Sequence, residues 1–223
     1  MELSKLLSHA DHTNLAPDAG WDSIKKTIDE GIRFETASVC IPSCYVKRAS
    51  DYAAGRVRIC TVIGFPLGYC PTETKVAETA TAIRDGADEI DMVINIGALK
   101  DGDTDYVKSD IAAVRKACVG KILKVIIECC LLTDDEMALM CKIVHEAGAD
   151  YIKTSTGFSK SGADAHNVKV LCDNAPAGLK VKAAGGISSL EDAELFISIG
   201  ADRLGTSRLV KIAMAESTEG SSY

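Results

Sequence analysis

Short apolar runs alternate with longer amphipathic stretches along the whole chain, and no linker interrupts this alternation. Runs rich in β-branched residues predict strands, and stretches with apolar residues three and four positions apart predict helices. The predicted strands lie near residues 10–15, 36–41, 58–63, 89–95, 123–128, 151–155, 179–183 and 203–206. The predicted helices cover residues 21–31, 43–54, 73–86, 104–119, 134–147, 164–175, 189–199 and 207–216, after a short amphipathic opening at residues 2–8.

Repeated strand–helix units predict an α/β fold with a parallel sheet. We expect a single (β/α)8 TIM barrel over residues 1–216, with a short N-terminal helix and a flexible C-terminal tail at residues 217–223. The chain has 223 residues, which is close to the usual size of one such barrel. A doubly wound open sheet is the alternative architecture, although the number of units favours closure.

A repeated tripeptide supports this architecture. Gly-Ala-Asp follows three of the predicted helices, at residues 86–88, 148–150 and 200–202, and each glycine is a plausible C-terminal cap before the next strand. Cap residues followed by acids mark several helix starts, at residues 71–73, 133–136 and 188–192. An iterated helix-to-strand joint favours one repeating domain over two separate ones.

The alternation of side chains along a strand predicts which residues face the barrel interior. At residues 89–95 the apolar set is Ile90, Met92 and Ile94, which turns the other parity inward. The same test in the other strands gives an inward set that is unusually polar. It comprises Asp91, Val93, Asn95, Lys124, Ile126, Glu128, Lys153, Lys182 and Cys40, with Asp11 expected inside near the end of the first strand.

Lysines inside a barrel suggest nucleophilic chemistry. A free lysine has a pKa near 10.4, so its neutral amine is scarce at neutral pH. A second ammonium group about 6 Å away would lower that pKa by roughly two units at an effective dielectric of ~20. Lys153 and Lys182 lie on neighbouring strands, and parity leaves open which one reacts. Asp91 is the best-placed acid/base for an imine-forming reaction.

The alternative is a structural network of buried ion pairs. Lys124 and Glu128 fit that alternative as well as they fit a role in catalysis. The alternative is weaker for Lys153 and Lys182, because hydrophobic residues would fill a barrel core without a desolvation cost.

Glycine-rich segments follow the last three predicted strands. In barrels, loops after the late strands commonly hold phosphate through backbone N–H groups. The candidate phosphate-binding residues are Thr156, Gly157, Gly185, Gly186, Gly205 and Ser207.

Five segments together resemble the deoxyribose-phosphate aldolase family. They are Asp-His-Thr-Asn-Leu at 11–15, Val-Cys-Ile-Pro at 39–42, Glu-Ile-Asp-Met-Val-Ile-Asn at 89–95, Tyr-Ile-Lys-Thr-Ser-Thr-Gly at 151–157 and Val-Lys-Ala-Ala-Gly-Gly-Ile at 181–187. The similarity runs from end to end, and the two lysine-containing segments are highly specific in this order and spacing.

This resemblance implies a class I aldolase of deoxyribose phosphate catabolism, which reversibly cleaves 2-deoxy-D-ribose 5-phosphate into D-glyceraldehyde 3-phosphate and acetaldehyde. It implies that Lys153 forms the Schiff base, that Lys182 lowers its pKa and that Asp91 moves protons through a water. It also implies a terminal tyrosine, here Tyr223, that assists proton movement, no cofactor, no metal and a possible homodimer.

Two residues depart from the family pattern. Arg208 stands where many members have a small residue, and Phe158 stands where some have a lysine. Cys40, inward on the second strand, is hypothesised to be an accessible thiol that reacts with unsaturated aldehydes, and core packing is its alternative role.

Composition excludes several other classes. A formal net charge of −7 argues against a nucleic-acid surface. The first residues show neither a secretory nor a membrane-spanning pattern, and nine cysteines without a Cys-x-x-Cys pair suggest reduced thiols, so we expect a cytoplasmic enzyme. A metal-dependent enzyme would need ligands, and His9 and His12 are the closest histidine pair among the four histidines. A phosphosugar isomerase or a non-catalytic ligand-binding barrel remains possible.

Overall fold

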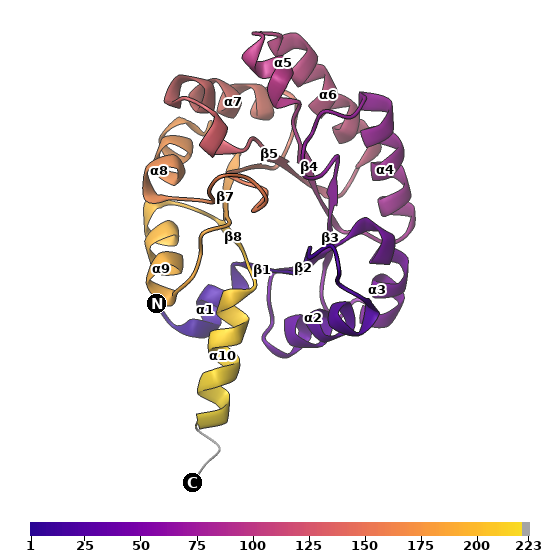
Figure 1. The fold of residues 1–223 in the computed structure, drawn as a ribbon, viewed down its shortest axis with the longest axis vertical. Helices are drawn as coiled ribbons and strands as arrows, with labels where there is room; N and C mark the ends of the chain where they lie inside the picture. Colours follow the sequence, from indigo (N-terminus) through magenta and orange to yellow (C-terminus); the bar gives the residue numbers. More distant parts are fainter. Residues whose placement is uncertain (220–223) are drawn as a thin grey trace.

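A computed structural model describes residues 1–219, and it shows one closed barrel of parallel strands. The strands pair in chain order, and β8 returns to pair with β1 (Figure 1). Their bounds are β1 Ala10–Thr13, β2 Ser38–Ile41, β3 Ile59–Ile63, β4 Glu89–Val93, β5 Ile122–Ile126, β6 Tyr151–Lys153, β7 Lys180–Ala184 and β8 Arg203–Thr206. The predicted TIM barrel is confirmed, and the open sheet is excluded.

Helices surround the barrel, and each strand is followed by at least one of them (Figure 1). The α-helices are α1 Leu3–Ser8, α2 Trp21–Arg33, α3 Val46–Ala53, α4 Thr72–Arg84, α5 Ile96–Lys100, α6 Thr104–Ala117, α7 Asp134–Glu146, α8 Ala165–Asn174, α9 Leu190–Ile199 and α10 Arg208–Glu219. Two 3-10 helices, η1 Ser43–Tyr45 and η2 Cys129–Leu131, precede α3 and α7. Among these helices, none combines the length and apolar character needed to cross a membrane.

Several boundaries differ from the predictions, among them the ends of β4, β6 and α10. Strand β4 ends at Val93, because the side chain of Asn95 accepts a hydrogen bond from the Ala98 N–H at 3.1 Å and begins the unpredicted helix α5. Asn95 is therefore a helix cap and not an inward strand residue. Strand β6 ends at Lys153 instead of residue 155, and α10 continues to Glu219 instead of ending at residue 216. Tyr223 lies outside the described residues.

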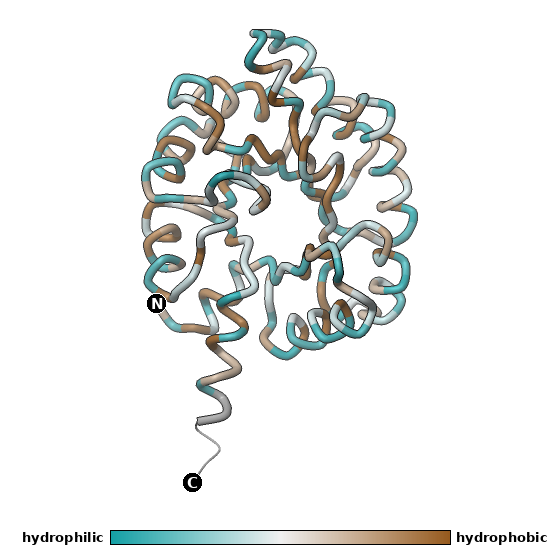
Figure 2. The backbone as a smooth tube through the Cα atoms, viewed as in Figure 1, coloured by the Kyte–Doolittle hydropathy of each residue, from teal (hydrophilic) through white to brown (hydrophobic). Residues whose placement is uncertain are grey.

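The main apolar core lies between the strands and the helices. Ile90, Met92 and Ile94 are fully buried in it, which confirms their predicted outward parity. Figure 2 shows hydrophobic residues along the strands and on helix sides that face them, and hydrophilic residues around the periphery. The barrel interior is therefore left to the opposite parity, which carries the polar side chains.

The three Gly-Ala-Asp segments form the same joint three times. Gly86, Gly148 and Gly200 all have positive φ, at 105°, 81° and 125°, as C-terminal caps commonly require. In each case the aspartate Oδ2 accepts a backbone N–H from the first or second residue of the preceding strand. The bonds are Ile59 N to Asp88 at 3.1 Å, Leu123 N to Asp150 at 2.8 Å and Val181 N to Asp202 at 2.9 Å. This segment therefore fixes where each helix ends and where the next strand of the barrel begins.

Two of the three predicted helix starts are confirmed as capping boxes, in which cap and third helical residue bond reciprocally: Thr133 with Glu136 and Ser189 with Asp192. Thr72 is not a cap. It is the first residue of α4, and its hydroxyl donates to Asp110 of α6 at 2.8 Å.

Candidate active site

The lysines and carboxylates predicted to face inward meet inside the barrel. Lys153 and Lys182 are direct register partners on β6 and β7, and Asp91 pairs with Lys124 across β4 and β5. Asp91, Lys124 and Lys182 have no exposed surface, and Lys153 is 3% exposed. Asp11, on β1, is fully buried as well, so the expectation for this short strand is also confirmed.

Asp91 lies at the centre of this cluster. Its Oδ2 accepts hydrogen bonds from Lys153 Nζ at 2.8 Å and from Lys182 Nζ at 2.7 Å. Its Oδ1 accepts one from Lys124 Nζ at 2.8 Å, and the thiol of Cys60 lies 3.3 Å away. One carboxylate therefore connects three ammonium groups.

Two further carboxylates continue the contacts deeper into the barrel. Asp11 Oδ2 accepts from Lys182 Nζ at 2.5 Å, and Asp11 Oδ1 accepts from the Arg203 guanidinium at 2.5 Å. Arg203 also reaches Glu89 at 3.0 Å, and Glu89 lies 2.6 Å from Lys124 Nζ. These contacts close a ring of alternating charges, here called the charge ring: Asp91, Lys182, Asp11, Arg203, Glu89 and Lys124.

The charge ring is electrically balanced, because three carboxylates alternate with three cations. Lys153 is attached to it through Asp91 and is a fourth, surplus cation. Loss of one proton from Lys153 would therefore leave a neutral cluster, whereas loss from Lys182 or Lys124 would break the alternation.

The pKa directions agree with this picture. Burial alone would raise the pKa of Asp91, but Lys124, Lys153 and Lys182 hold it well below its usual range. The pKa of Asp11 is lowered in the same way, against its burial, by Lys124, Lys182 and Arg203. Burial would lower the pKa of Lys182, but Asp11 and Asp91 outweigh it and raise the pKa. Lys182 is therefore a permanent cation at neutral pH.

The sequence analysis missed three members of the interior: Glu89, Arg203 and Cys60. Glu89 has the same parity as Asp91, two positions earlier, and Arg203 stands next to the outward residue Leu204. Extending the parity test to the first residue of each strand would have found both. Cys60 faces its register partner Cys40 and could have been found from the parity of Ile59 and Thr61.

Glu128 does not join the charge ring. Strand β5 ends at Ile126, and Glu128 has a left-handed backbone conformation with φ of 56°. Its carboxylate accepts the Thr156 N–H at 3.2 Å and a very short hydrogen bond from the Thr156 hydroxyl. Parity holds only within a strand, so the expectation that Glu128 faces the interior beside Lys124 is wrong. Glu128 instead fixes the segment that follows β6.

A cavity of about 1170 Å³ opens at the carboxyl ends of the strands. Of the predicted phosphate-binding residues, all six line it: Thr156, Gly157, Gly185, Gly186, Gly205 and Ser207. Lys153 lines the cavity too, which makes it the surplus cation that a ligand can meet. Arg208 lies at the same wall, where its Nε donates to the Ser188 carbonyl at 3.3 Å.

Close backbone contacts shape the glycine-rich wall of this cavity. Gly185 and Gly186 both have positive φ, at 71° and 72°. A Cβ on Gly162 would lie 2.3 Å from the Gly185 carbonyl carbon, and the Ala163 N–H donates to the Gly185 carbonyl at 3.1 Å. The segment after β6 therefore packs directly on the loop after β7. This wall needs glycine both for conformation and for close approach.

Phe158 and Phe65 meet at the mouth of the barrel, with ring centroids 5.3 Å apart in an edge-to-face arrangement. Phe158 lines the cavity and is 52% exposed. Phe158 thus presents an aromatic face to the cavity.

Cys40 is buried, so the expectation of an accessible thiol is wrong. Its exposed fraction is 0%, because it packs with Cys60 and Val62 while Leu15 and Phe65 lie against the group. A hydrogen bond with Cys60 lowers the pKa of Cys40, and burial raises the pKa of Cys60.

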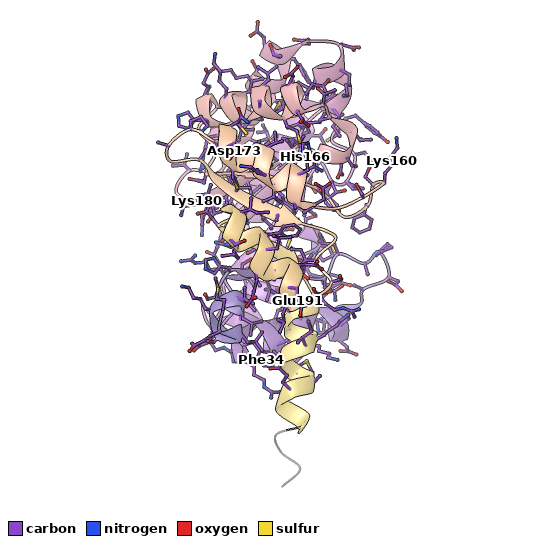
Figure 3. All side chains as sticks on the ribbon, turned by 90° about the vertical axis from the view of Figure 1, so that its left-hand side faces the viewer. Phe34, Lys160, His166, Asp173, Lys180 and Glu191 are labelled. Carbon is purple, nitrogen blue, oxygen red and sulfur yellow. The ribbon has the colours of Figure 1, made fainter. Side chains whose placement is uncertain are left out.

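Three of the four histidines have separate partners and do not converge on one site. His12 Nε2 lies 2.8 Å from Glu30, His9 Nδ1 lies 2.9 Å from the Asp202 carbonyl, and His166, on the outer side of α8 (Figure 3), pairs with Asp134.

Two buried groups of potential metal ligands share Cys60, one with Cys40 and Asp91 and the other with Asp11 and Glu89. The ammonium group of Lys124 contacts Cys60, Asp91 and Glu89 at 3.3, 2.8 and 2.6 Å. A metal ion would have to displace that ammonium group.

Comparison with known proteins agrees with the geometry. The protein-family model described as DeoC/LacD family aldolase matches residues 6–205. A deoxyribose-phosphate aldolase from Streptococcus pyogenes serotype M4 is 52% identical over all 223 residues of both chains, and one from Streptococcus agalactiae serotype Ia is equally similar. The solved structure of the tetrameric deoxyribose phosphate aldolase from Aeropyrum pernix aligns with a TM-score of 0.88 and 32% identity, covering 98% of this chain and 93% of its own. A solved aldolase named QR15 aligns with a TM-score of 0.91 and 37% identity, covering 96% and 97%. The chain therefore belongs to the DeoC/LacD family of aldolases.

Proposed function

We propose that this aldolase reversibly cleaves 2-deoxy-D-ribose 5-phosphate into D-glyceraldehyde 3-phosphate and acetaldehyde, with Lys153 as the Schiff-base residue. The observation that carries the proposal is the position of Lys153, a surplus cation on a balanced charge ring and at the wall of the cavity. The identity with curated deoxyribose-phosphate aldolases supports the choice of substrate.

Lys153 is favoured over Lys182 as the nucleophile for two reasons. Lys182 contacts two carboxylates, at 2.5 and 2.7 Å, and is fully buried, whereas Lys153 contacts Asp91 and lines the cavity. Lys182 remains protonated because Asp11 and Asp91 raise its pKa, and an ammonium group is not a nucleophile.

The reaction follows from these positions. Lys153 Nζ adds to the C1 aldehyde carbon of the open-chain sugar, and loss of one water gives an iminium ion. A base accepts the proton of the C3 hydroxyl, the C2–C3 bond breaks, and its electron pair forms an enamine with the former iminium. Glyceraldehyde 3-phosphate leaves, a proton returns to C2, and water hydrolyses the remaining iminium to release acetaldehyde.

Asp91 is the proposed proton acceptor and donor, acting through a water. Its carboxylate lies 2.8 Å from Lys153 Nζ, and its lowered pKa keeps it in the ionised form, which is the form that can accept a proton. Lys124 and Asp11 belong to the same proposal, as charge-ring members that hold Asp91 and Lys182 in place.

The phosphate group is proposed to bind at the glycine-rich wall. Gly185, Gly186 and Gly205 bring backbone close to the cavity, and Ser207 immediately precedes the N-terminus of α10. Arg208 adds a positive charge that many relatives lack at this position. Thr156 and Gly157 close the opposite side, with the Thr156 hydroxyl already engaged by Glu128.

Two broader proposals accompany the activity. Reaction in the cytoplasm is supported by the nine cysteines, all of them free thiols. A homodimer stays a prediction that sedimentation velocity can test.

Borohydride trapping tests the proposed function. Incubation with 2-deoxyribose 5-phosphate and sodium borohydride should inactivate the protein and leave a reduced adduct on Lys153, identified by peptide mass mapping. Lys153→Arg should abolish the adduct. The control is Lys160→Arg, which changes an exposed lysine labelled in Figure 3 and should keep the adduct. An adduct on Lys182 would overturn the assignment, and no adduct at all would refute a Schiff-base mechanism.

A further inference from the structure

No member of the charge ring lines the cavity, and the deep half of the ring consists of Arg203 and Glu89. Arg203 is 6% exposed and Glu89 is 0% exposed, and neither lies in the cavity wall. Burying such groups is costly unless each is paired, and a well-packed apolar pair would fill the same space. Their charge therefore needs a reason beyond packing.

Arg203 and Glu89 complete the alternation of the ring. Arg203 bridges Asp11 and Glu89, at 2.5 and 3.0 Å, and Glu89 contacts Lys124 at 2.6 Å. Lys124 contacts Asp91, the partner of Lys153. Asp11 contacts Lys182, which also contacts Asp91. Removal of either charge leaves the ring unbalanced by one unit.

We infer that Arg203 and Glu89 are positioning residues, and that their opposite charges set the pH range in which Lys153 forms its imine. The inference rests on the proposed function. Without Arg203 the ring has an excess carboxylate, and the ammonium form of Lys153 balances it. Without Glu89 the ring has an excess cation, and Lys153 releases its proton more readily.

Other charged or titratable groups also surround Lys153, and each strand contributes. They are Asp11 on β1, Cys40 on β2, Cys60 on β3, Glu89 and Asp91 on β4, Lys124 on β5, Tyr151 on β6, Lys182 on β7 and Arg203 on β8, together with Glu128 after β5. Arg58 lies 3.7 Å from Glu89, but its side chain is 61% exposed and solvent screens its charge. None of these groups except Arg203 and Glu89 changes in the variants below, so opposite shifts report on the ring.

The size of the effect follows from distance. Arg203 and Glu89 are separated from Lys153 by intervening ring members. A unit charge about 10 Å away would shift a titration by roughly one pH unit at an effective dielectric of ~20. The rate of imine trapping at a pH on the acid limb should then change about tenfold.

The experiment measures the rate of trapping by cyanoborohydride, with 2-deoxyribose 5-phosphate, as a function of pH. The midpoint of the acid limb should rise by about one pH unit in Arg203→Gln and fall by a similar amount in Glu89→Gln. The double variant should return towards the parent midpoint, and Arg203→Lys should keep it. A merely structural role would lower all rates without opposite shifts.

The outcomes are distinguishable. If the parent forms no adduct on Lys153, the proposed function fails. If the parent is trapped but both single variants keep its midpoint, or shift it in one direction, the inference is overturned. If circular dichroism shows that Arg203→Gln does not fold, Glu89→Gln alone tests the inference. An acid-limb midpoint of Glu89→Gln that stays at the parent value or rises would contradict it.

Discussion

Replacing Asp91 with asparagine should separate its role in the chemistry from its role in the charge ring. The change keeps the shape of the side chain but removes the charge that connects three ammonium groups. Lys182 keeps Asp11 at 2.5 Å and Lys124 keeps Glu89 at 2.6 Å, whereas Lys153 loses the carboxylate that it contacts.

The expected loss of stability follows from these remaining partners. Removing one member of a buried charge pair typically costs 3–5 kcal/mol. Two of the three lysines retain a carboxylate, and Lys153 can release its proton, so we expect about 3 kcal/mol, the lower end of that range. Cleavage should slow by about 10²–10⁴-fold because the proton-transfer group is lost. Imine formation should persist, since Lys153 and Lys182 remain.

Three measurements on the same variant check this reasoning. Urea unfolding gives stability, borohydride trapping gives imine formation, and release of glyceraldehyde 3-phosphate gives cleavage. The matched control is Asp91→Asn combined with Lys153→Met, which removes the stranded ammonium group and should recover most of the lost stability while staying inactive. Parental cleavage by the single variant would exclude Asp91 from the chemistry, and unchanged stability would refute the energetic argument.

The acid dependence of stability provides a fourth check on this variant. The folded pKa of Asp91 lies well below the unfolded value, which is near 3.9, so its contribution is complete above that value and decreases as the pH falls below it. Asp91→Asn should therefore lose less stability than the parent between about pH 4 and pH 2.

Three further changes test other parts of the site. Cys40→Ala should leave enzyme lifetime at high acetaldehyde unchanged, because the Cys40 thiol is fully buried and Leu15 and Phe65 pack against its cluster. A longer lifetime of the variant would show that unsaturated aldehydes reach this thiol. Gly205→Ala should slow imine trapping and lower the free energy of unfolding in urea by about 1–3 kcal/mol, because the new Cβ would lie 2.9 Å from the Ala184 Cβ. The control Gly20→Ala should have neither effect, because no atom lies within 4 Å of its Cβ position. Burial lowers the pKa of His12, so the unfolded state binds its proton first and stability should fall below about pH 6.5, by at most ~1.4 kcal/mol per pH unit. Urea unfolding of His12→Asn should lack that decrease.

The fold and the centre of the site could be predicted because both depend on local periodicity. Strand parity alone placed Asp91, Lys153 and Lys182 inside the barrel, and the register pairs Lys153 directly with Lys182. Parity requires only that the strand be continuous, so it failed where strands end, at Asn95 and Glu128.

The closure of the charge ring could not be predicted in the same way. Arg203 reaches Glu89 across the barrel from β8 to β4, between residues 114 positions apart. Such a contact depends on the stagger of all the strands around the barrel, which no single strand encodes. The burial of Cys40 depends likewise on Leu15 and Phe65, two loop residues outside its strand. The residues were visible in the sequence, but their partners were not.

The extent of α10 changes what is expected of Tyr223. The helix contains twelve residues from Arg208, at the cavity, to Glu219, and is therefore about 18 Å long. The four residues that follow can span at most ~13 Å. A tyrosine at position 223 therefore reaches its own Lys153 most easily if the last turns of α10 unwind. If the tyrosine does assist proton movement at the imine-bearing carbon, Tyr223→Phe should lower turnover and slow deuterium exchange into acetaldehyde, with trapping on Lys153 largely intact. Replacing Ser217 and Thr218 with alanine, which strengthens the helix by up to a few tenths of a kcal/mol per residue, should then reduce the exchange rate as well. Unchanged exchange in the Tyr223→Phe variant would remove the tyrosine from the mechanism, and a loss in that variant without any effect of the alanines would show that unwinding is not needed.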